Sequence, residues 1–321
     1  MQQWSSKVTN RVWVMGDAVV DLIPEGALHY LKCPGGAPAN VAVGVARLGG
    51  DAAFIGRVGA DPFGRFMADT LSGEGVDIGA LRLDPDHRTS TVLVALDDEG
   101  ERSFTFMVRP SADQFLTPDE LPRFKAGQWL LTCSIALANE PVRTSCLQAM
   151  AAIKAAGGLV CFDPNLRPEV WGNPAEMLPL VREAIAQADA VKLSIEELQL
   201  LSGEDDLAAG LATLSGPALV LVTRGAAGVV ARLGGELLEW VGQKVTPLDT
   251  TGAGDAFVAG LLAALAALAG RSSLPTLAEL PAILAQAHGC GALATTAKGA
   301  MTALPTRSEL NAFLRSGASG C

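Results

Sequence analysis

Short apolar runs alternate with helix-like runs along most of the sequence, and few folds accommodate this alternation. The strand-like runs are apolar throughout, as strands buried on both faces are. They cover residues 11–16, 52–59, 128–134, 158–163, 190–194 and 218–225. Between them, apolar residues recur at helical spacing in 40–49, 62–75, 142–158 and 177–189. The alternation predicts a three-layer α/β/α domain with a central, mainly parallel sheet.

Two segments, 18–33 and 90–110, break this alternation and are typical of β-hairpins. The second would turn at DDEG, residues 97–100. We expect the two hairpins to form a small antiparallel sheet. It would act as a lid over the carboxyl ends of the parallel strands, where open α/β sheets bind ligands. The predicted domain spans 11–315, with lid segments at about 18–33 and 88–110 and a disordered tail at 316–321.

Charge and hydropathy exclude several classes of protein. The formal net charge of the 321 residues is −10, and no Lys/Arg-rich run is present, so a nucleic-acid partner is not expected. No apolar run reaches the roughly 20 residues of a membrane span, including the Ala-rich run 256–270. The six cysteines lack CxxC or metal-ligand spacing, as reduced core thiols do. We therefore expect a cytoplasmic protein that does not bind membranes.

The motif DTTGAGDAF, residues 249–257, places an acid beside bare backbone. Amides of Gly252, Ala253 and Gly254 at a helix N-terminus would form an anion-binding nest, and Asp255 could be only a helix cap. A carboxylate would repel a permanently bound phosphate, so an anion that arises during reaction fits better. Asp255 would then take a proton from a hydroxyl that attacks a phosphoryl group. Neither GxxxxGK[ST] nor a strand followed by GxGxxG is present.

The same motif resembles the C-terminal signature of the ribokinase-like (PfkB) carbohydrate kinases. Residues 34–64 resemble their N-terminal signature, and the segments DPNLR, KLSIEEL and VTRGAAG also fit that family. The resemblance covers about residues 11–315. Within the family, GDAVVDLIPEG, GERSFTFMVRPSAD and TAKGAMTALP are most similar to bacterial fructokinases, with aminoimidazole riboside kinases as near relatives. Phe106 and VRPSAD favour fructose, because the riboside kinases tend to place a tyrosine before a different tail.

The resemblance implies roles on the sugar side of the site. Asp255 would be the general base, and the amides of Gly252 to Gly254, with Ala253 between them, would form the anion hole. The other expected sugar-site residues are Asp21, Gly35, Gly36, Asn40, Phe106 and Arg167. Several have simpler explanations: Asp21 as a hairpin-edge acid, Asn40 as a helix N-cap, Phe106 as lid core, and Arg167 in a structural salt bridge.

The resemblance also implies a nucleotide site and a cation site. Mg-ATP would lie near Lys192, Glu197, Thr223, Gly225, Gly228 and His288. Gly225 and Gly228 could instead serve only a turn between strands. Ser194 stands where the family more often has Asn, which puts a direct contact there in doubt. A potassium site is implied at Asp249, Thr251, Ala294, Ala297 and Gly299.

The predicted activity is transfer of the ATP γ-phosphate to the 6-hydroxyl of D-fructose. Two alternatives stay open: phosphorylation of the 5-hydroxyl of aminoimidazole riboside, and a non-catalytic sugar- or nucleotide-binding relative. The resemblance further implies a homodimer formed through the lid.

Overall fold

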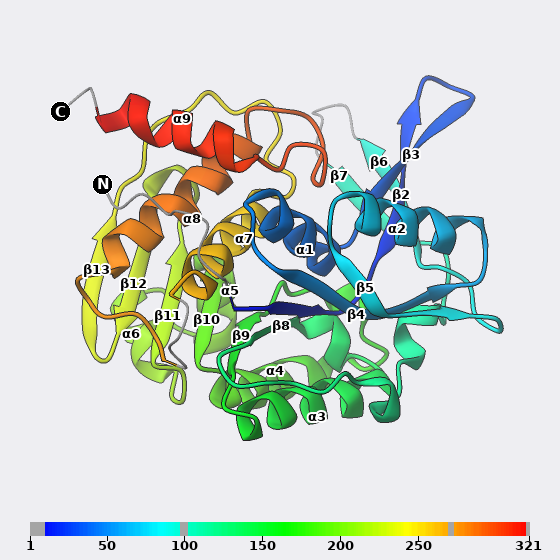
Figure 1. Ribbon diagram of the computed structural model, residues 1–321, viewed down its shortest axis with the longest axis horizontal. Helices are drawn as coiled ribbons and strands as arrows, with labels where there is room; N and C mark the ends of the chain where they lie inside the picture. The colour runs from blue at the N-terminus through cyan, green and yellow to red at the C-terminus, as the bar shows by residue number, and fades with distance from the viewer. Residues whose placement is uncertain (1–9, 97–101, 269–272, 319–321) are drawn as a thin grey trace.

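A nine-stranded sheet forms the centre of the computed structural model, which describes residues 10–96, 102–268 and 273–318 (Figure 1). The strand order is β13-β12-β11-β10-β9-β8-β1-β4-β5, and neighbours are parallel from β11 to β5. At the other edge, β12 pairs antiparallel with both of its neighbours, β11 and β13. The strands are β1 Val12–Met15, β4 Ala52–Gly59, β5 Asp77–Asp84, β8 Trp129–Cys133, β9 Leu159–Asp163, β10 Ala190–Ser194, β11 Leu219–Thr223, β12 Val229–Leu233 and β13 Glu236–Trp240.

Helices cover both faces of this sheet. One face carries α1 Ala37–Arg47, α2 Pro62–Gly73, α7 Ala253–Ala266, α8 Leu280–Ala294 and α9 Arg307–Ala318 (Figure 1). The other carries α3 Val142–Ala155, α4 Pro174–Gln187, α5 Ile195–Ser202 and α6 Leu207–Thr213. The predicted three-layer fold with a mainly parallel sheet is confirmed.

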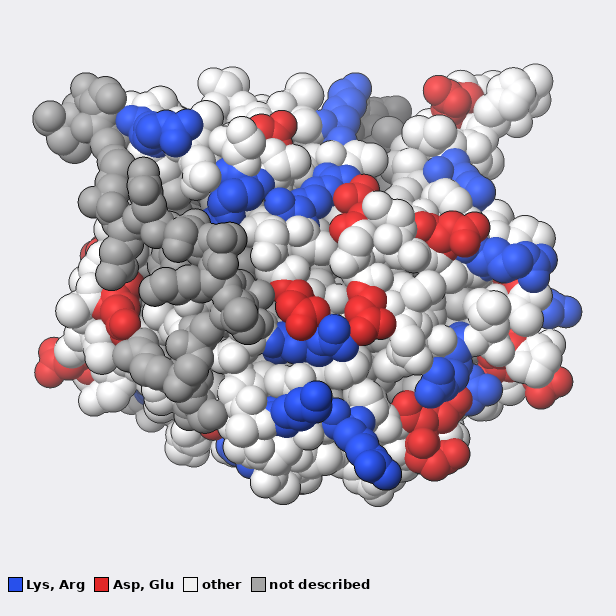
Figure 2. Space-filling view, viewed as in Figure 1, with Lys and Arg blue, Asp and Glu red and all other residues white. Residues whose placement is uncertain are grey.

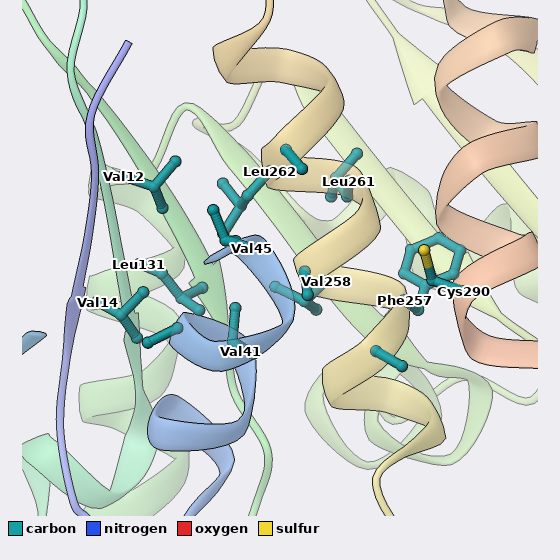
Figure 3. Packing of buried hydrophobic residues seen from close by; sticks show 14 of the residues in the cluster. Val12, Val14, Val41, Val45, Leu131, Phe257, Val258, Leu261, Leu262 and Cys290 are labelled. Atoms are coloured by element: carbon teal, nitrogen blue, oxygen red, sulfur yellow. The ribbon is translucent and has the colours of Figure 1, made fainter. Parts of the chain in front are cut away.

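Strand β1 shows why its residues are apolar on both sides. Val12 and Val14 belong to the core cluster that includes α1 and α7, and Figure 3 shows them directed toward Val41 of α1. Trp13 and Met15 alternate with them and belong to the cluster on the opposite face. Because successive strand residues point to opposite faces, a strand covered on both sides needs a continuous apolar run.

A separate four-stranded sheet carries the two predicted hairpins. Its order is β3-β2-β6-β7, with β2 Val19–Glu25, β3 His29–Gly35, β6 Thr91–Leu96 and β7 Arg102–Phe106. The expectation of a wholly antiparallel sheet is wrong, because β2 and β6 pair in parallel. The two hairpins lie side by side through their first strands, which run in the same direction. The turn predicted at 97–100 lies outside the described residues.

Hydrogen bonds from two arginines, Arg47 and Arg307, connect the region of α1 with the C-terminal part of the chain. Arg47 at the end of α1 pairs with Glu74 at 2.6 Å and donates to the carbonyls of Met301 and Leu304. Arg307 of α9 donates to the carbonyl of Leu48. These bonds hold α1 against the segment that follows α8. On the face shown in Figure 2, acidic and basic side chains are interspersed.

Helix α9 continues to Ala318, three residues beyond the predicted boundary at 315, and 319–321 lie outside the described residues. Helix α7, which carries the Ala-rich run, is buried along most of its length. Within the described ranges, no helix combines the length and apolarity needed to span a bilayer.

Candidate active site

Helix α7 begins at Ala253, two residues before Asp255. Its N-cap is Gly252, with φ 76°, and Asp255 therefore lies inside the first turn rather than at the cap. A side chain at Gly252 would bring Cβ within 2.8 Å of the Cα of Ala300, so glycine is required both by its backbone angle and by its surroundings. The amide of Ala253 already donates to the carbonyl of Thr250 at 3.2 Å. The amide of Ala256 makes the first intrahelical bond, to the carbonyl of Gly252 at 2.8 Å, so the amides of Gly254 and Asp255 lie where a helix N-terminus offers its N–H groups to an anion.

Asn40 and Asp255 join the two signature segments. The side-chain amide of Asn40 donates to Oδ2 of Asp255 at 2.8 Å. Asn40 is not the helix cap that the sequence allowed, because the N-cap of α1 is Gly36. Burial raises the pKa of Asp255, while the bond from Asn40 and the charges of Lys192 and Arg167 lower it. The result is a half-buried carboxylate with one oxygen held in place and a raised pKa.

Lys192 and Asp163 form a buried ion pair beside the start of α7. Lys192 Nζ lies 3.3 and 3.4 Å from the two carboxylate oxygens of Asp163. A Cβ added to Gly254 would lie 3.3 Å from the same nitrogen, so the ammonium group lies against the glycine segment. Burial raises the pKa of Asp163 to about 7 against the opposing effect of Lys192. Burial lowers the pKa of Lys192, but Asp163, Glu197 and Asp255 outweigh it and raise that pKa overall.

The predicted sugar residues of the small sheet lie close to one another. Asp21 of β2 pairs in register with Cys33 of β3, next to Gly35. A side chain at Gly35 would place Cβ 2.2 Å from Oδ2 of Asp21, and one at Gly36 would place it 2.7 Å from the carbonyl oxygen of Asp17. Glycine is therefore needed at both positions, because the carboxylate of Asp21 and the backbone of Asp17 occupy the space that a side chain would fill.

Phe106 and Arg167 approach from two other elements. Phe106 ends β7 and is half-buried, with the Arg109 guanidinium 5.4 Å from its ring centroid. Arg167 follows β9 and donates to the carbonyl of Leu166 at 2.9 Å. Its charge lowers the pKa of Asp17 and of Asp255, so the guanidinium faces the acidic side of the site.

On the nucleotide side, Glu197 has a structural task. Its two oxygens accept the backbone amides of Leu166, at 2.9 Å, and Ser194, at 2.8 Å. Ser194 is the N-cap of α5 and accepts the amide of Glu197 in return. Ser194 and Glu197 thus form a capping box at the start of α5, which gives Ser194 a structural role.

Of the remaining predicted nucleotide residues, Thr223 ends β11, Gly225 and Gly228 lie in the turn between β11 and β12, and His288 lies in the middle of α8. Thr223 donates to the carbonyl of Leu193 at 3.2 Å. Gly228 has φ 92°, and a side chain there would meet the carbonyl of Trp240 at 2.1 Å, so this glycine is needed for the turn itself. Gly225 has open space around it. The His288 ring packs on Gly242, and burial lowers its pKa, which favours the neutral imidazole.

The predicted cation residues converge only in part. Asp249 accepts the amide and hydroxyl of Thr251, at 3.0 and 2.6 Å, and the amide of Gly299 at 2.9 Å. The amides of Leu248 and Asp249 both donate to the carbonyl of Thr295, a residue that sequence reasoning missed. Ala294 ends α8, and Ala297 follows it in the same loop. In the part of the chain that the structure describes, no three His, Cys, Asp or Glu side chains cluster as metal ligands.

The pfkB-family carbohydrate kinase model matches residues 10–307. The chain belongs to the pfkB family of carbohydrate kinases. A fructokinase of Klebsiella pneumoniae is 58% identical over 96% of this chain and 100% of its own. An aminoimidazole riboside kinase of Salmonella typhimurium is 44% identical over 97% of each chain. The crystal structure of the Vibrio cholerae O395 fructokinase, bound to fructose, ADP and calcium, has a TM-score of 0.90 and 55% identity, and it covers 96% of this chain and 100% of that one.

Three acidic residues of this pfkB kinase, Asp17, Asp113 and Asp163, were not among the site residues predicted from the sequence. Asp163 ends strand β9, and Asp17 follows β1, so both lie where parallel strands end toward the ligand. Asp113 lies in the 3₁₀ turn Ala112–Phe115, beyond the small sheet. An acid directly after a fully apolar run was the available signal for Asp17 and Asp163. Asp113 carried no such signal.

Proposed function

We propose that this carbohydrate kinase transfers the γ-phosphoryl group of ATP to the 6-hydroxyl of D-fructose, with Asp255 as general base. One observation carries the proposal: Asp255 is oriented by Asn40 while Lys192 lies against the adjacent glycine segment. A base and a cation are thus placed together beside helix-terminal amides. The fructokinases that match this chain at 55–58% identity support the choice of sugar.

In the proposed reaction, the proton of the sugar 6-hydroxyl moves to the carboxylate of Asp255. The sugar oxygen forms a bond to the γ-phosphorus, and the bond from that phosphorus to the β,γ-bridging oxygen breaks, releasing ADP. The amides of Gly252 to Gly254 and the ammonium group of Lys192 stabilise the negative charge that develops on the phosphoryl oxygens. Burial raises the pKa of Asp255, and the hydrogen bond from Asn40 and the charges of Lys192 and Arg167 oppose that rise by stabilising the ionised base.

The sugar would be held by Asp21, Gly35, Gly36, Asn40 and Arg167. Carboxylate and amide oxygens accept several hydroxyl donors, and the two glycines allow close backbone approach. Phe106 would cover the sugar from the small sheet. Closure of that sheet as a lid would exclude water, which otherwise competes with the sugar for ATP.

ATP would bind with Mg²⁺ near Lys192 and Glu197 and along Thr223, Gly225, Gly228 and His288. Bound magnesium would supply positive charge that offsets the negative charge of the phosphates. Both oxygens of Glu197 accept backbone amides, so a contact of this residue with the metal through water fits its geometry. Potassium would bind carbonyl oxygens in the loop that includes Ala294, Ala297 and Gly299, with Asp249 and Thr251 ordering that loop. The test for potassium is turnover in KCl against turnover in tetramethylammonium chloride.

A homodimer through the small sheet accompanies this proposal. Three large apolar side chains of the β2–β3 hairpin are exposed: Leu28 (87%), Tyr30 (54%) and Leu31 (52%). The hairpin projects from the body of the molecule (Figure 1). A second copy would cover these side chains, and Leu31→Asp should then shift the mass measured by light scattering to that of a monomer. We propose that the enzyme works in the cytoplasm, in keeping with the burial of Cys133, Cys146, Cys161 and Cys290.

The deciding experiment is an ADP-release assay with Mg-ATP and either D-fructose, aminoimidazole riboside, ribose or glucose. Asp255→Asn should lower turnover on fructose by roughly 10²- to 10⁴-fold, because it removes the base. Asp206→Asn is the matched control, since Asp206 is an exposed N-cap acid of α6 and should leave turnover unchanged.

The same assay separates the alternatives. The relative that phosphorylates aminoimidazole riboside is 44% identical, so fastest turnover on the riboside would replace fructose while keeping the mechanism. Tight binding of fructose or ATP without turnover on any sugar would favour a non-catalytic binding protein.

A further inference from the structure

A small cavity lies between the end of β1, the small sheet and the turn at 112–115. Its volume is about 20 Å³, which is enough for one hydroxyl group or water. Asp17, Phe106, Arg109, Asp113 and Asn139 are among the residues that line it. Seven of the eleven side chains that line it are polar, so the cavity suits a hydrogen-bonding group better than an apolar one.

Two carboxylates in this cavity, those of Asp17 and Asp113, each have an oxygen without a hydrogen-bond donor among the described residues. Asp17 is only 6% exposed, and its Oδ1 has no hydrogen-bond partner among the described residues. Oδ1 of Asp113 is likewise buried and without a partner in those residues. Burial and the charge of Asp113 raise the pKa of Asp17, and burial raises the pKa of Asp113. Buried acceptors are normally paired, so a donor is expected to approach from the cavity.

The cavity adjoins the proposed sugar site. The carbonyl of Asp17 lies against Gly36, and the carboxylate of Asp17 interacts electrostatically with Asp255 and Arg167. Phe106, the proposed cover of the sugar, is one of its walls. A sugar whose reacting hydroxyl faces Asp255 would therefore present its other hydroxyls toward Asp17 and Asp113.

We propose that Asp17 and Asp113 form a specificity subsite that accepts a hydrogen bond from a hydroxyl at the C1–C2 end of a ketose. This inference rests on the proposed function, because it assumes that C6 of the same sugar faces Asp255. A carboxylate accepts hydroxyl donors and offers none, so the subsite selects a sugar with free hydroxyls at that end. A riboside carries a heteroaromatic base there and leaves the two carboxylates without those donors.

The test is calorimetric titration of the full-length chain with D-fructose and with 2,5-anhydro-1-deoxy-D-mannitol, which lacks both hydroxyls. Asp113→Asn and Asp17→Asn should each weaken fructose binding about tenfold and analogue binding less than twofold. Asp119→Asn is the control, since Asp119 lies exposed in the same stretch of chain and should change neither affinity. Thermal unfolding of each variant checks its fold, and the two variants test the subsite independently.

Equal weakening of both ligands, or unchanged fructose binding, would overturn the subsite. Turnover of fructose by the wild-type enzyme, measured in parallel, keeps the two proposals apart. Wild-type turnover combined with equal weakening overturns the subsite alone. Absence of wild-type turnover overturns the proposed function, while selective weakening of fructose binding would still support the subsite.

Discussion

The side chains of Asn40 and Asp255 meet at 2.8 Å across 215 positions of sequence, and this bond joins the two halves of the site. Asn40 comes from the first turn of α1 and Asp255 from the first turn of α7. Both helices pack on the same face of the central sheet, so their N-termini lie beside each other. The position of Asp255, the proposed base, therefore depends on how α1 and α7 pack. Substitutions in each helix test this dependence separately.

Asn40→Ala should lower turnover and shift its pH dependence. The lost bond stabilises the ionised form of Asp255, so the pKa of Asp255 should rise and the acid limb of the rate profile should move to higher pH. A bond to a charged group predicts a loss of roughly 10- to 100-fold at pH 7. The measurement is kcat from pH 5 to 9, with Asn173→Ala at the exposed N-cap of α4 as control. An unshifted acid limb would show that Asn40 does not tune this carboxylate.

Gly254→Ala should impair catalysis more than stability. The new Cβ would lie 3.3 Å from Lys192 Nζ, in the space proposed for the transferred phosphoryl group. We expect kcat to fall by about 10²-fold or more, the size of an anion-hole defect, with little change in melting temperature. Gly73→Ala is the matched control, because nothing lies within 4 Å of a Cβ added there. Full activity of Gly254→Ala would remove the glycine segment from the mechanism.

Lys192→Met should destabilise the fold in a pH-dependent way. Without Lys192, Asp163 is a buried unpaired carboxylate, and breaking such a pair costs about 3–5 kcal/mol. Lys192 lowers the pKa of Asp163, which is about 7 in the presence of that lysine, so the pKa rises further in the variant; at pH 5 the carboxyl is protonated and the cost should shrink. Urea unfolding at pH 5 and pH 8 measures the difference.

Lys154→Met is the control for that series. Lys154 makes an ion pair of 3.2 Å with Asp189 at the surface, where a pair contributes about 1 kcal/mol or less. A loss in Lys192→Met that is equal at both pH values would contradict a buried, titrating Asp163.

Asp17→Asn should stabilise the sugar-free enzyme at alkaline pH. Burial and the charges of Asp113 and Asp255 raise the folded-state pKa of Asp17 from its ordinary 3.8 to about 7. A carboxyl with a raised folded pKa contributes stability that is full below the unfolded pKa and is lost as pH rises through the folded pKa. The variant should exceed wild type by up to roughly 4 kcal/mol at pH 8 and match it near pH 4.

The measurement for Asp17 is the free energy of unfolding in urea across that pH range, with the exposed Asp205→Asn as control. A difference from wild type that does not grow with pH would mean that Asp17 is ionised without penalty in the folded state.

Local pattern was enough for the buried strands of the main sheet and for the motif around Asp255. Continuous apolar runs predicted β1, β4, β8, β9, β10 and β11, because a strand covered on both faces has no polar side. Strands β5 and β13 were missed: they lie at the two edges of the sheet, with most of their residues exposed or partly buried, so their sequences lack such a run. Asp255 beside its glycines was predicted because nest and acid lie within nine residues.

Only the tertiary structure decided which distant groups meet. The parallel pairing of β2 with β6, the contact of Asn40 with Asp255, and the pair of Lys192 with Asp163 each join separate segments of the chain. The burial of Asp17 and Asp113 in one cavity is of the same kind. Sequence by itself determined the elements, the family signatures and the residue types available for chemistry, since these follow from local spacing. Burial, pKa and partner depend on packing between elements, which local spacing does not encode.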